Sequence, residues 1–260
     1  MDNLYPESEI GSFFNILCDS FLGFSRSDIQ LKLNSHLSES ELLKFHYAIK
    51  DLKQFKPVQY ITGSQYFYEN DFLVNEHTLI PRPETEELVD LIIKENPEPK
   101  LRVLDIGTGS GAISISLSLF LKESEVIAFD VSENALELAK TNSMNLDSSV
   151  DFQLVDILNP DYLGMPFDII VSNPPYVLEK EKEKMESNVL EFEPHLALFV
   201  EDDDPLIFYK KIVDFCGENL NSGGRLYFEI NEKYGYQVLN LLGSSEFDNL
   251  EIIKDLSNKD

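Results

Sequence analysis

Beyond residue 101 the chain alternates between short apolar segments and helical patterns, and this alternation limits the fold more than any other feature. Strands separated by helices are typical of a mostly parallel sheet with helices on both faces. Such sheets bind their ligands outside the carboxyl ends of the strands. The strand candidates are residues 102–106, 126–129, 152–155, 167–171 and 225–230. The sequence therefore predicts an α/β, Rossmann-like domain with a ligand site at one edge of its sheet.

Residues 7–55 carry a different, helical pattern, in which apolar residues recur at the spacing of a helix face. A second helix is expected through Ile29, Leu31 and Leu33. A third begins at Ser38, which forms a capping box with Glu41 ahead of an apolar stripe. The pattern predicts a small N-terminal bundle of three helices.

The pattern changes again at Pro57. Residues 58–63, 66–68 and 72–74 are rich in aromatic and β-branched side chains and are expected to be strands, with a turn at residues 69–71. We therefore predict three parts, which are a helical domain at residues 1–56, a hairpin linker at 57–83 and the α/β domain at 84–260.

The composition of the chain indicates which binding partners and which cellular location to expect. The chain has 21 Lys+Arg against 47 Asp+Glu, a formal net charge of −26. This charge opposes tight binding to a phosphate backbone, although a local basic patch would not be visible in the total.

Cys18 and Cys216 lie in apolar helical patterns and are expected to be buried free thiols. The first residues show neither a basic leader nor a long apolar segment, so we expect no membrane contact and a cytoplasmic location.

A glycine-rich turn follows the first strand of the α/β domain. Gly107, Gly109 and Gly111 allow the backbone to approach a ligand closely as a helix begins. A tight turn without a ligand would give the same pattern, and a dinucleotide site is the nearest competitor. The third glycine comes one position too early for that site. The Asp105 carboxylate would also repel a pyrophosphate and attract an ammonium group, which favours an amino-acid-like cofactor.

The next two strands end in acidic residues. Asp130 comes about twenty residues after the turn, where a carboxylate accepts hydrogen bonds from ribose hydroxyls. Asp156 and Ile157 follow the third strand, and a backbone amide with an apolar side chain there would flank an adenine. Asp156 can equally be a solvated residue at a strand end. Together these ends match S-adenosylmethionine.

The fourth strand ends in Asn173, Pro174, Pro175 and Tyr176. The prolines hold this run extended, because each fixes its own φ and keeps the preceding residue out of the helical region. The Asn173 side-chain oxygen and the Pro174 carbonyl would each accept one N–H of a planar amide, with Tyr176 as an apolar wall. A strand-terminating turn is the structural alternative. The pocket suits methyl transfer to nitrogen without a metal or a catalytic histidine, and none of the four histidines has a ligand spacing.

Several segments resemble one known family, the HemK-type glutamine methyltransferases that modify peptide chain release factors. The resemblance covers nearly the whole chain and is carried by residues 57–63, 67–68, 79–86, 107–111, 130, 173–176, 193–194 and 197–198. The Asn-Pro-Pro-Tyr run alone is shared with DNA and ribosomal RNA amino-methyltransferases, so the substrate assignment rests on residues 57–63 and 67–68.

The resemblance implies a helical N-terminal domain that helps to recognise the release factor, joined by a hairpin to a seven-stranded methyltransferase domain. The implied reaction methylates the side-chain nitrogen of the glutamine in the Gly-Gly-Gln loop and leaves S-adenosylhomocysteine. Arg82, Pro83 and Glu84 would shape a pocket between the domains. The expected cofactor residues are Gly107, Thr108, Gly109, Ser110, Gly111, Asp130, Asp156, Ile157 and Asn173. The expected substrate residues are Asn173, Pro174, Pro175 and Tyr176, of which Asn173, Pro174 and Tyr176 are catalytic.

Two other functions share parts of this pattern. An amino-methyltransferase for DNA adenine or ribosomal RNA guanine would use the same pocket, but the net charge of −26 opposes it. A catalytically silent cofactor-binding module would not need the intact Asn173 pocket. We therefore expect a monomeric, S-adenosylmethionine-dependent protein-glutamine N-methyltransferase whose partners are release factors, without nucleic acid, membrane or metal.

Overall fold

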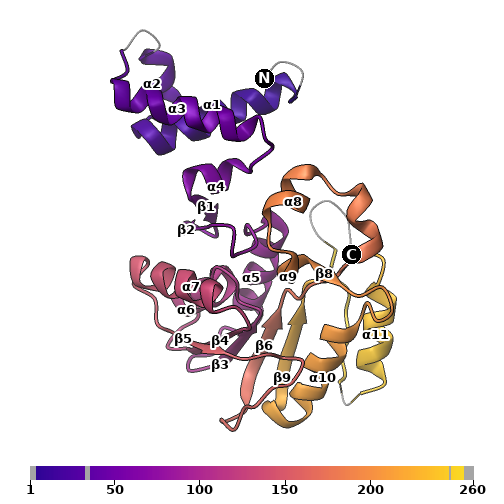
Figure 1. Cartoon of the computed structure of the whole chain (residues 1–260). Coiled ribbons are helices and arrows are strands. Elements are labelled where there is room, and N and C mark those ends of the chain that lie inside the picture. Colours follow the sequence, from indigo (N-terminus) through magenta and orange to yellow (C-terminus); the bar gives the residue numbers. More distant parts are fainter. Residues whose placement is uncertain (1–3, 33–35, 246, 255–260) are drawn as a thin grey trace. The chain divides into compact units, whose positions relative to one another are not determined.

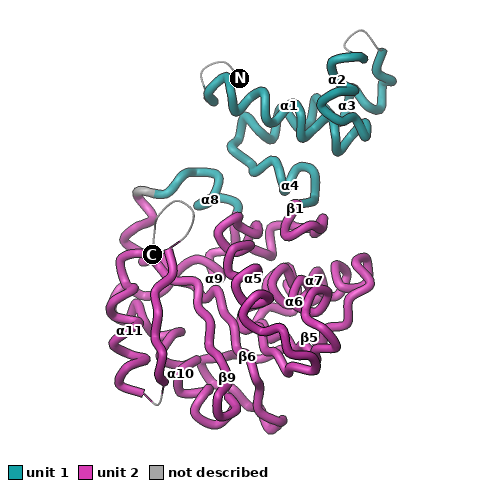
Figure 2. The backbone as a smooth tube through the Cα atoms, turned by 180° about the vertical axis from the view of Figure 1, so that it is seen from behind, with its two compact units in different colours: residues 1–64, 185–192 teal, residues 65–184, 193–260 magenta. Residues whose placement is uncertain are grey.

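The computed structural model describes residues 4–32, 36–245 and 247–254, and the chain divides into two compact units. Unit 1 consists of residues 1–64 and 185–192, and unit 2 of residues 65–184 and 193–260 (Figure 2). Leu33, which was expected in the second helix, lies outside the described residues. Within the described part of the chain, no helix is both long and apolar enough to cross a bilayer.

Unit 1 consists mainly of short helices, as the sequence predicted for most of it. Its helices are α1 (Glu7–Leu22), α2 (Arg26–Leu31), α3 (Glu39–Leu52), α4 (Val58–Thr62) and α8 (Ser187–Phe192). The predicted capping box starts α3, because the Ser38 hydroxyl accepts from the Glu41 N–H at 3.3 Å and the Glu41 carboxylate accepts from the Ser38 N–H at 2.7 Å. Leu17, Ala48 and Leu52 form the core with Val58.

The prediction of a strand at residues 58–63 was wrong, because these residues form α4. The Pro57 carbonyl accepts from the N–H groups of Tyr60 and Ile61 at 3.0 and 3.2 Å. Gly63 ends the helix at a φ of 77°. Val58 and Ile61, three residues apart, both pack on the unit 1 core, which is a helical spacing. Packing on one side therefore overrode the β-branched composition.

The hairpin predicted after this segment is present. β1 (Ser64–Phe67) and β2 (Asn70–Leu73) form a two-stranded sheet. The turn between them uses Tyr68 and Glu69 at positive φ, so it begins one residue earlier than predicted. Phe67 and Phe72 are fully buried in the core of unit 2, which fixes the hairpin to that unit.

Unit 2 is built on a parallel five-stranded sheet of order β5-β4-β3-β6-β9 (Figure 1). The strands are β3 (Arg102–Ile106), β4 (Glu125–Asp130), β5 (Val150–Leu154), β6 (Phe167–Ser172) and β9 (Leu220–Phe228). All five predicted strands are present, with ends one residue longer at β4 and β6 and larger shifts at β5 and β9. The resemblance implied seven strands, whereas in the described residues this sheet has five, and residues 247–254 form no strand. The short β7 (Val177–Leu178) and β8 (Phe199–Val200) pair separately.

Helices cover both faces of the sheet. They are α5 (Pro83–Glu95), α6 (Ala112–Phe120), α7 (Glu133–Asn145), α10 (Ile207–Asn219) and α11 (Gly235–Gly243), with the short η1 (Glu179–Lys184) and α9 (His195–Leu198) between. Neighbouring strand residues face opposite ways, so Val103 joins a core with α5 and α6, whereas Leu104 joins a core with α10. In Figure 1, α7 lies on the β5 side of the sheet and α10 on the β9 side.

Both cysteines are buried free thiols, as predicted. Cys18 lies in unit 1, and Cys216 is a residue of α10 whose side chain joins the core between this helix and the sheet. Burial raises the pKa of the Cys216 thiol to about 12, so it stays protonated at neutral pH.

Candidate functional site

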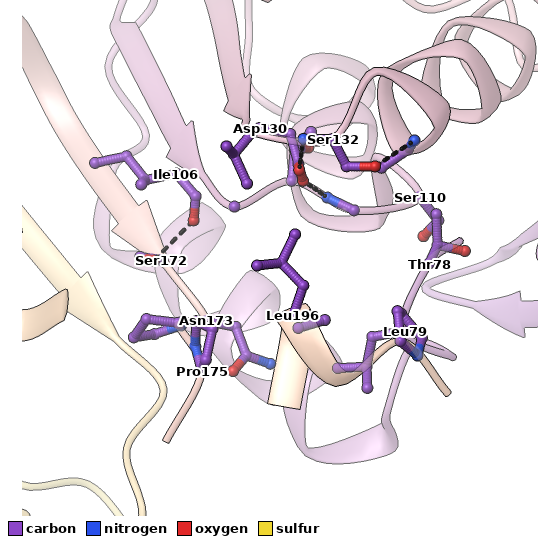
Figure 3. A pocket seen from close by; sticks show the side chains of 18 of the residues that line it. Thr78, Leu79, Ile106, Ser110, Asp130, Ser132, Ser172, Asn173, Pro175 and Leu196 are labelled. Atoms are coloured by element: carbon purple, nitrogen blue, oxygen red, sulfur yellow. Dashed lines mark hydrogen bonds between the residues drawn. The ribbon is translucent and has the colours of Figure 1, made fainter. Parts of the chain in front are cut away.

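A cavity lies at the carboxyl ends of the strands, within unit 2, where a parallel sheet is expected to bind its ligand. It is lined by the segments that follow β3, β4, β5 and β6, and by residues from three further segments, 76–85, 194–197 and α10. Figure 3 shows Asp130 and Ser132 along one side of this cavity and Asn173 and Pro175 along the other, with Leu196 between them. The parallel topology thus brings together residues far apart in sequence.

The glycine-rich loop forms one wall of the cavity. The N–H groups of Gly107 and Thr108 both donate to the Phe129 carbonyl, at 2.9 and 3.0 Å, which ties the loop to the end of β4. Gly109 has a φ of 56°, and a Cβ placed on it would meet nothing within 4 Å. The loop therefore exposes open backbone to the cavity, which is what close approach of a ligand requires. Thr108 and Ser110 line the same wall.

Asp105 lies beneath this loop and is fully buried. Its Oδ2 accepts from the Thr108 hydroxyl at 2.7 Å and from the Ser114 N–H at 3.1 Å. Burial raises the pKa of Asp105 to about 7, against the opposing effect of these hydrogen bonds. The expected contact with an ammonium group does not fit this position, because Asp105 is not among the residues that line the cavity. The carboxylate instead joins the loop to the first turn of α6.

Asp130 ends β4 and faces the cavity. One carboxylate oxygen accepts from the Gly109 N–H at 2.8 Å and the other from the Ser132 N–H at 2.9 Å. Burial raises the pKa of this group, and its backbone hydrogen bonds oppose the rise. Each carboxylate oxygen can accept a second hydrogen bond, so Asp130 keeps capacity for the two hydroxyls of a ribose.

Asp156 and Ile157 also line the cavity. The Asp156 side chain is exposed, and its Oδ1 accepts from the Leu158 N–H at 2.9 Å. Ile157 is buried and packs with the core on the α10 face of the sheet. These residues offer an apolar surface beside a polar strand end, which suits an adenine. No group of His, Cys, Asp and Glu side chains able to hold a metal ion occurs in the described part of the chain.

Residues 173–176, which follow β6, line two different cavities. Asn173, Pro174 and Pro175 line the first cavity. The Ser172 hydroxyl donates to the Ile106 carbonyl at 2.7 Å and fixes the base of this run on β3. Tyr176 lines a neighbouring cavity of unit 2 instead. The predicted apolar wall at Tyr176 therefore does not face the same space as Asn173 in this structure.

Tyr176 is directed toward Glu229, and its hydroxyl donates to the Glu229 carboxylate at 3.3 Å. Burial, followed by the charge of Glu229, raises the pKa of the Tyr176 hydroxyl. Arg82 lines both cavities, Pro83 begins α5, and Glu84 lines the neighbouring cavity. The residues expected to shape a pocket thus lie around two adjacent cavities of unit 2.

Sequence reasoning did not identify the polar residues that support the cavity. Glu193 is buried, accepting from Arg82 Nη2 at 2.6 Å and from the Ile80 N–H at 3.3 Å. Asn142 of α7 is also buried, and its amide group donates to the carbonyls of Ser110 and Leu73. Their partners are distant in sequence. The Glu193-Pro194 pair carried the resemblance, which is the one signal that marked this region.

Gly111 differs from the other loop glycines, because it does not line the cavity. It has a φ of 83°, and a Cβ there would come within 2.7 Å of Ile115 Cδ1 and 3.3 Å of Ala139 Cβ. Gly111 therefore permits the loop to pack on α6 and α7.

We expect Gly111→Ala to lower the free energy of unfolding by about 1–3 kcal/mol, because it combines a left-handed backbone with a steric conflict in the core. Urea denaturation measures the change. Gly217→Ala is the matched control, since this exposed glycine in α10 has open space around it and should gain up to about 1 kcal/mol of helix stability. Equal stabilities of the two variants would contradict the packing role of Gly111.

The raised pKa of Asp105 makes the stability of the protein depend on pH. Because this pKa is about 7 in the folded state, above the ordinary value for an unfolded Asp, the contribution of Asp105 falls as the pH rises from about 4 to about 7. Relative to the neutral isostere D105N, the wild type should lose about 2 kcal/mol of unfolding free energy between pH 5.5 and pH 8.

Urea denaturation at both pH values measures this difference. Asp214→Asn, at an exposed position of α10, controls for the loss of one surface charge. Parallel pH profiles for the wild type and D105N would show that Asp105 does not titrate in this range.

Two family models match the chain. One corresponds to the α/β structure of unit 2 and the other to the helices of unit 1. Residues 97–216 match the methyltransferase domain model, and residues 14–63 match the PrmC N-terminal domain model. The first range contains the glycine-rich loop, Asp130 and the run from Asn173 to Tyr176. The second contains most of the helices of unit 1.

Curated relatives match over nearly the full length. A release factor glutamine methyltransferase of Flavobacterium psychrophilum is 46% identical, over 99% of this chain and 92% of the relative. The enzyme of the same name from Bacteroides thetaiotaomicron is 44% identical, over 100% of this chain and 94% of the relative. The corresponding enzyme of Enterococcus faecalis is 38% identical, over 92% and 86%. The chain therefore belongs to the release factor glutamine methyltransferase family.

Proposed function

We propose that the protein transfers a methyl group from S-adenosylmethionine to the side-chain nitrogen of the glutamine in the Gly-Gly-Gln loop of peptide chain release factors. The observation that carries this proposal is the position of Asn173 and Pro174 on the same cavity as the glycine-rich loop and Asp130. The groups that would accept hydrogen bonds from a carboxamide therefore line the same cavity as the groups that would bind a nucleoside. The family membership of the chain supports the same reaction.

The cofactor-binding role falls to the strand ends on the Asp130 side of the cavity. Backbone of the loop 107–110 would hold the amino-acid part, Asp130 the ribose hydroxyls, and Asp156 with Ile157 the adenine. Gly111 supports this loop from behind. When bound, S-adenosylmethionine supplies a methyl group activated on a sulfonium sulfur and is left as S-adenosylhomocysteine.

The substrate role falls to the run after β6. Asn173 Nδ2 donates to the Thr85 hydroxyl at 3.4 Å, so its Oδ1 is left to accept from a substrate. Asn173 Oδ1 and the Pro174 carbonyl would each accept one N–H of the glutamine carboxamide, which fixes the plane of the group. Orientation of this kind contributes roughly 7–11 kcal/mol when the reacting atoms are in near-attack geometry. The methylated nitrogen is a strong acid and loses its proton to water.

Unit 1 is proposed to recognise the release factor. Several large apolar side chains on α1 and α3 are exposed, and exposed apolar surface of this kind is used in protein contacts. These side chains are Phe14, Ile16, Leu42, Leu43, Tyr47 and Ile49. The net charge of −26 disfavours nucleic acid as a direct substrate. We propose that the protein acts as a monomer in the cytoplasm, without a metal.

Asn173→Ala tests the substrate role. We expect kcat/KM to fall by about 10²- to 10³-fold, by analogy with the loss of one preorganised polar group at a reaction centre. The assay uses purified release factor, labelled S-adenosylmethionine and peptide mass spectrometry of the product. Asn145→Ala, at an exposed position of α7, is the control and should retain wild-type turnover.

Two outcomes would contradict the proposal. Near-normal turnover of Asn173→Ala would mean that another group positions the carboxamide. Methyl transfer to RNA or DNA, with none on the loop glutamine, would assign the enzyme to nucleic acid bases instead.

A further inference from the structure

A carboxylate that does not line the cofactor cavity lies behind Asn173. Glu229 follows β9 directly, and its N–H donates to the Ser172 carbonyl at 3.0 Å, so the two strand ends are joined beside the site. The Tyr209 hydroxyl donates to the Glu229 carbonyl at 3.1 Å and fixes this residue from α10. Glu229 is therefore held firmly next to Asn173, although it is not among the residues lining the same cavity.

The Glu229 side chain accepts hydrogen bonds from two hydroxyl groups. Thr85 Oγ1 donates to Oε2 at 2.6 Å, and the Tyr176 hydroxyl donates to Oε1 at 3.3 Å. Burial raises the pKa of Glu229, and the hydrogen bonds with Thr85, Tyr176 and Asn173 oppose the rise. The nearby charge of Glu84 adds to the rise. An ionised carboxylate offers only acceptors, so both hydroxyls must donate to it.

Because the Thr85 hydroxyl donates to Glu229, the direction of the hydrogen bond between Thr85 and Asn173 is also fixed. A threonine hydroxyl has one proton, and that of Thr85 is used on Glu229. Thr85 can then only accept from Asn173, which it does from Nδ2 at 3.4 Å. The amide of Asn173 would otherwise be free to turn by 180°, since its oxygen and nitrogen ends have nearly the same shape. Glu229 selects one of these two orientations, through Thr85 and through its own hydrogen bond with Asn173.

We propose that Glu229 and Thr85 are positioning residues that hold the Asn173 amide with its oxygen toward the cavity, and so make the site select a carboxamide over a carboxylate. The inference rests on the proposed function, because it concerns how the substrate glutamine is received. With Oδ1 facing the cavity, Asn173 accepts an N–H of glutamine and repels the oxygens of a glutamate. With the amide reversed, Nδ2 would face the cavity, which would lose its acceptor and admit a carboxylate.

The position of Thr85 allows its hydrogen bond to be removed without disturbing the packing around it. Thr85 lies in the first turn of α5 and is buried, so a hydroxyl-to-methyl exchange changes its hydrogen bonding but hardly its volume. Glu229 does not line the cavity, which argues against its acting as the base that takes the proton from the product. Its influence on the substrate passes through Asn173, which it reaches both directly and through Thr85.

The test compares Thr85→Val and Thr85→Ser, with Thr141→Val as the matched control, since the Thr141 hydroxyl donates only to the Glu137 carbonyl of its own helix. Methylation of purified release factor gives kcat and KM, calorimetry gives the Kd of S-adenosylhomocysteine, and thermal denaturation gives Tm. We expect Thr85→Val to lower kcat by about tenfold or more, as for loss of one oriented hydrogen bond. Thr85→Ser should recover most of this loss, with Kd and Tm close to wild type in both variants.

A second measurement reads the orientation of the amide itself. A release factor carrying Glu in place of the loop Gln serves as a competitive inhibitor. We expect its Ki, relative to the KM of the normal release factor, to be about tenfold lower for Thr85→Val and for Glu229→Gln than for the wild type. A merely structural role of Thr85 would not change this ratio.

Two results would overturn the inference. One is an unchanged kcat and Ki ratio in Thr85→Val, and the other is a loss of kcat that Thr85→Ser does not recover and that accompanies weaker cofactor binding and a lower Tm. Failure of the proposed function would look different, because the wild type itself would then leave the release factor unmethylated.

Discussion

The parallel register of the central sheet is the constraint on which the whole site depends. Ile106 pairs with Phe129 and Ser172, and Ser172 pairs with Phe228, so four strands reach the same row at one edge. The residue after each member of this row belongs to the site or supports it, and these residues are Gly107, Asp130, Asn173 and Glu229. A slip of one residue in any strand would turn its side chains to the other face and break this alignment. The two apolar cores on the faces of the sheet oppose such a slip, and they thereby hold Asp130 and Asn173 in fixed positions on the cavity.

Much of this arrangement could be read from the sequence, because strands and their ends leave strong signals. Apolar runs indicated the five strands, and glycine, acidic or asparagine residues marked where the runs stopped. The segment at residues 58–63 was mistaken for a strand because β-branched residues dominate it, whereas packing of Val58 and Ile61 on one core selects a helix. Gly111 was grouped with the cofactor residues because the motif treats its glycines alike. Its contact with Ile115 shows that the third glycine serves helix packing.

The polar contacts that support the site were beyond sequence reasoning, because pairing between distant side chains has no periodic signal. Arg82 and Glu193 are 111 positions apart, and Thr85 and Glu229 are 144 apart. Tyr176 was expected beside the substrate because it is adjacent to Pro175 in the chain, but its hydroxyl is drawn to Glu229 in the next cavity. Asp105 likewise was placed on the ligand side of the loop and lies beneath it. In each case a buried or partly buried carboxylate decides where its neighbours point, since it must find donors within the protein.

The stiffness of the proline pair after Asn173 has a consequence for the partner. In the proposed reaction the Pro174 carbonyl belongs to this stiff run and the Asn173 amide is held by Thr85, so the molecule that carries the carboxamide makes the adjustment. A glutamine inside a helix or a strand is tied by its own backbone and cannot deliver its side chain deep into a recess at a strand edge. A glutamine at the tip of a pliable, glycine-flanked loop can do so, because its backbone has the freedom that the enzyme lacks.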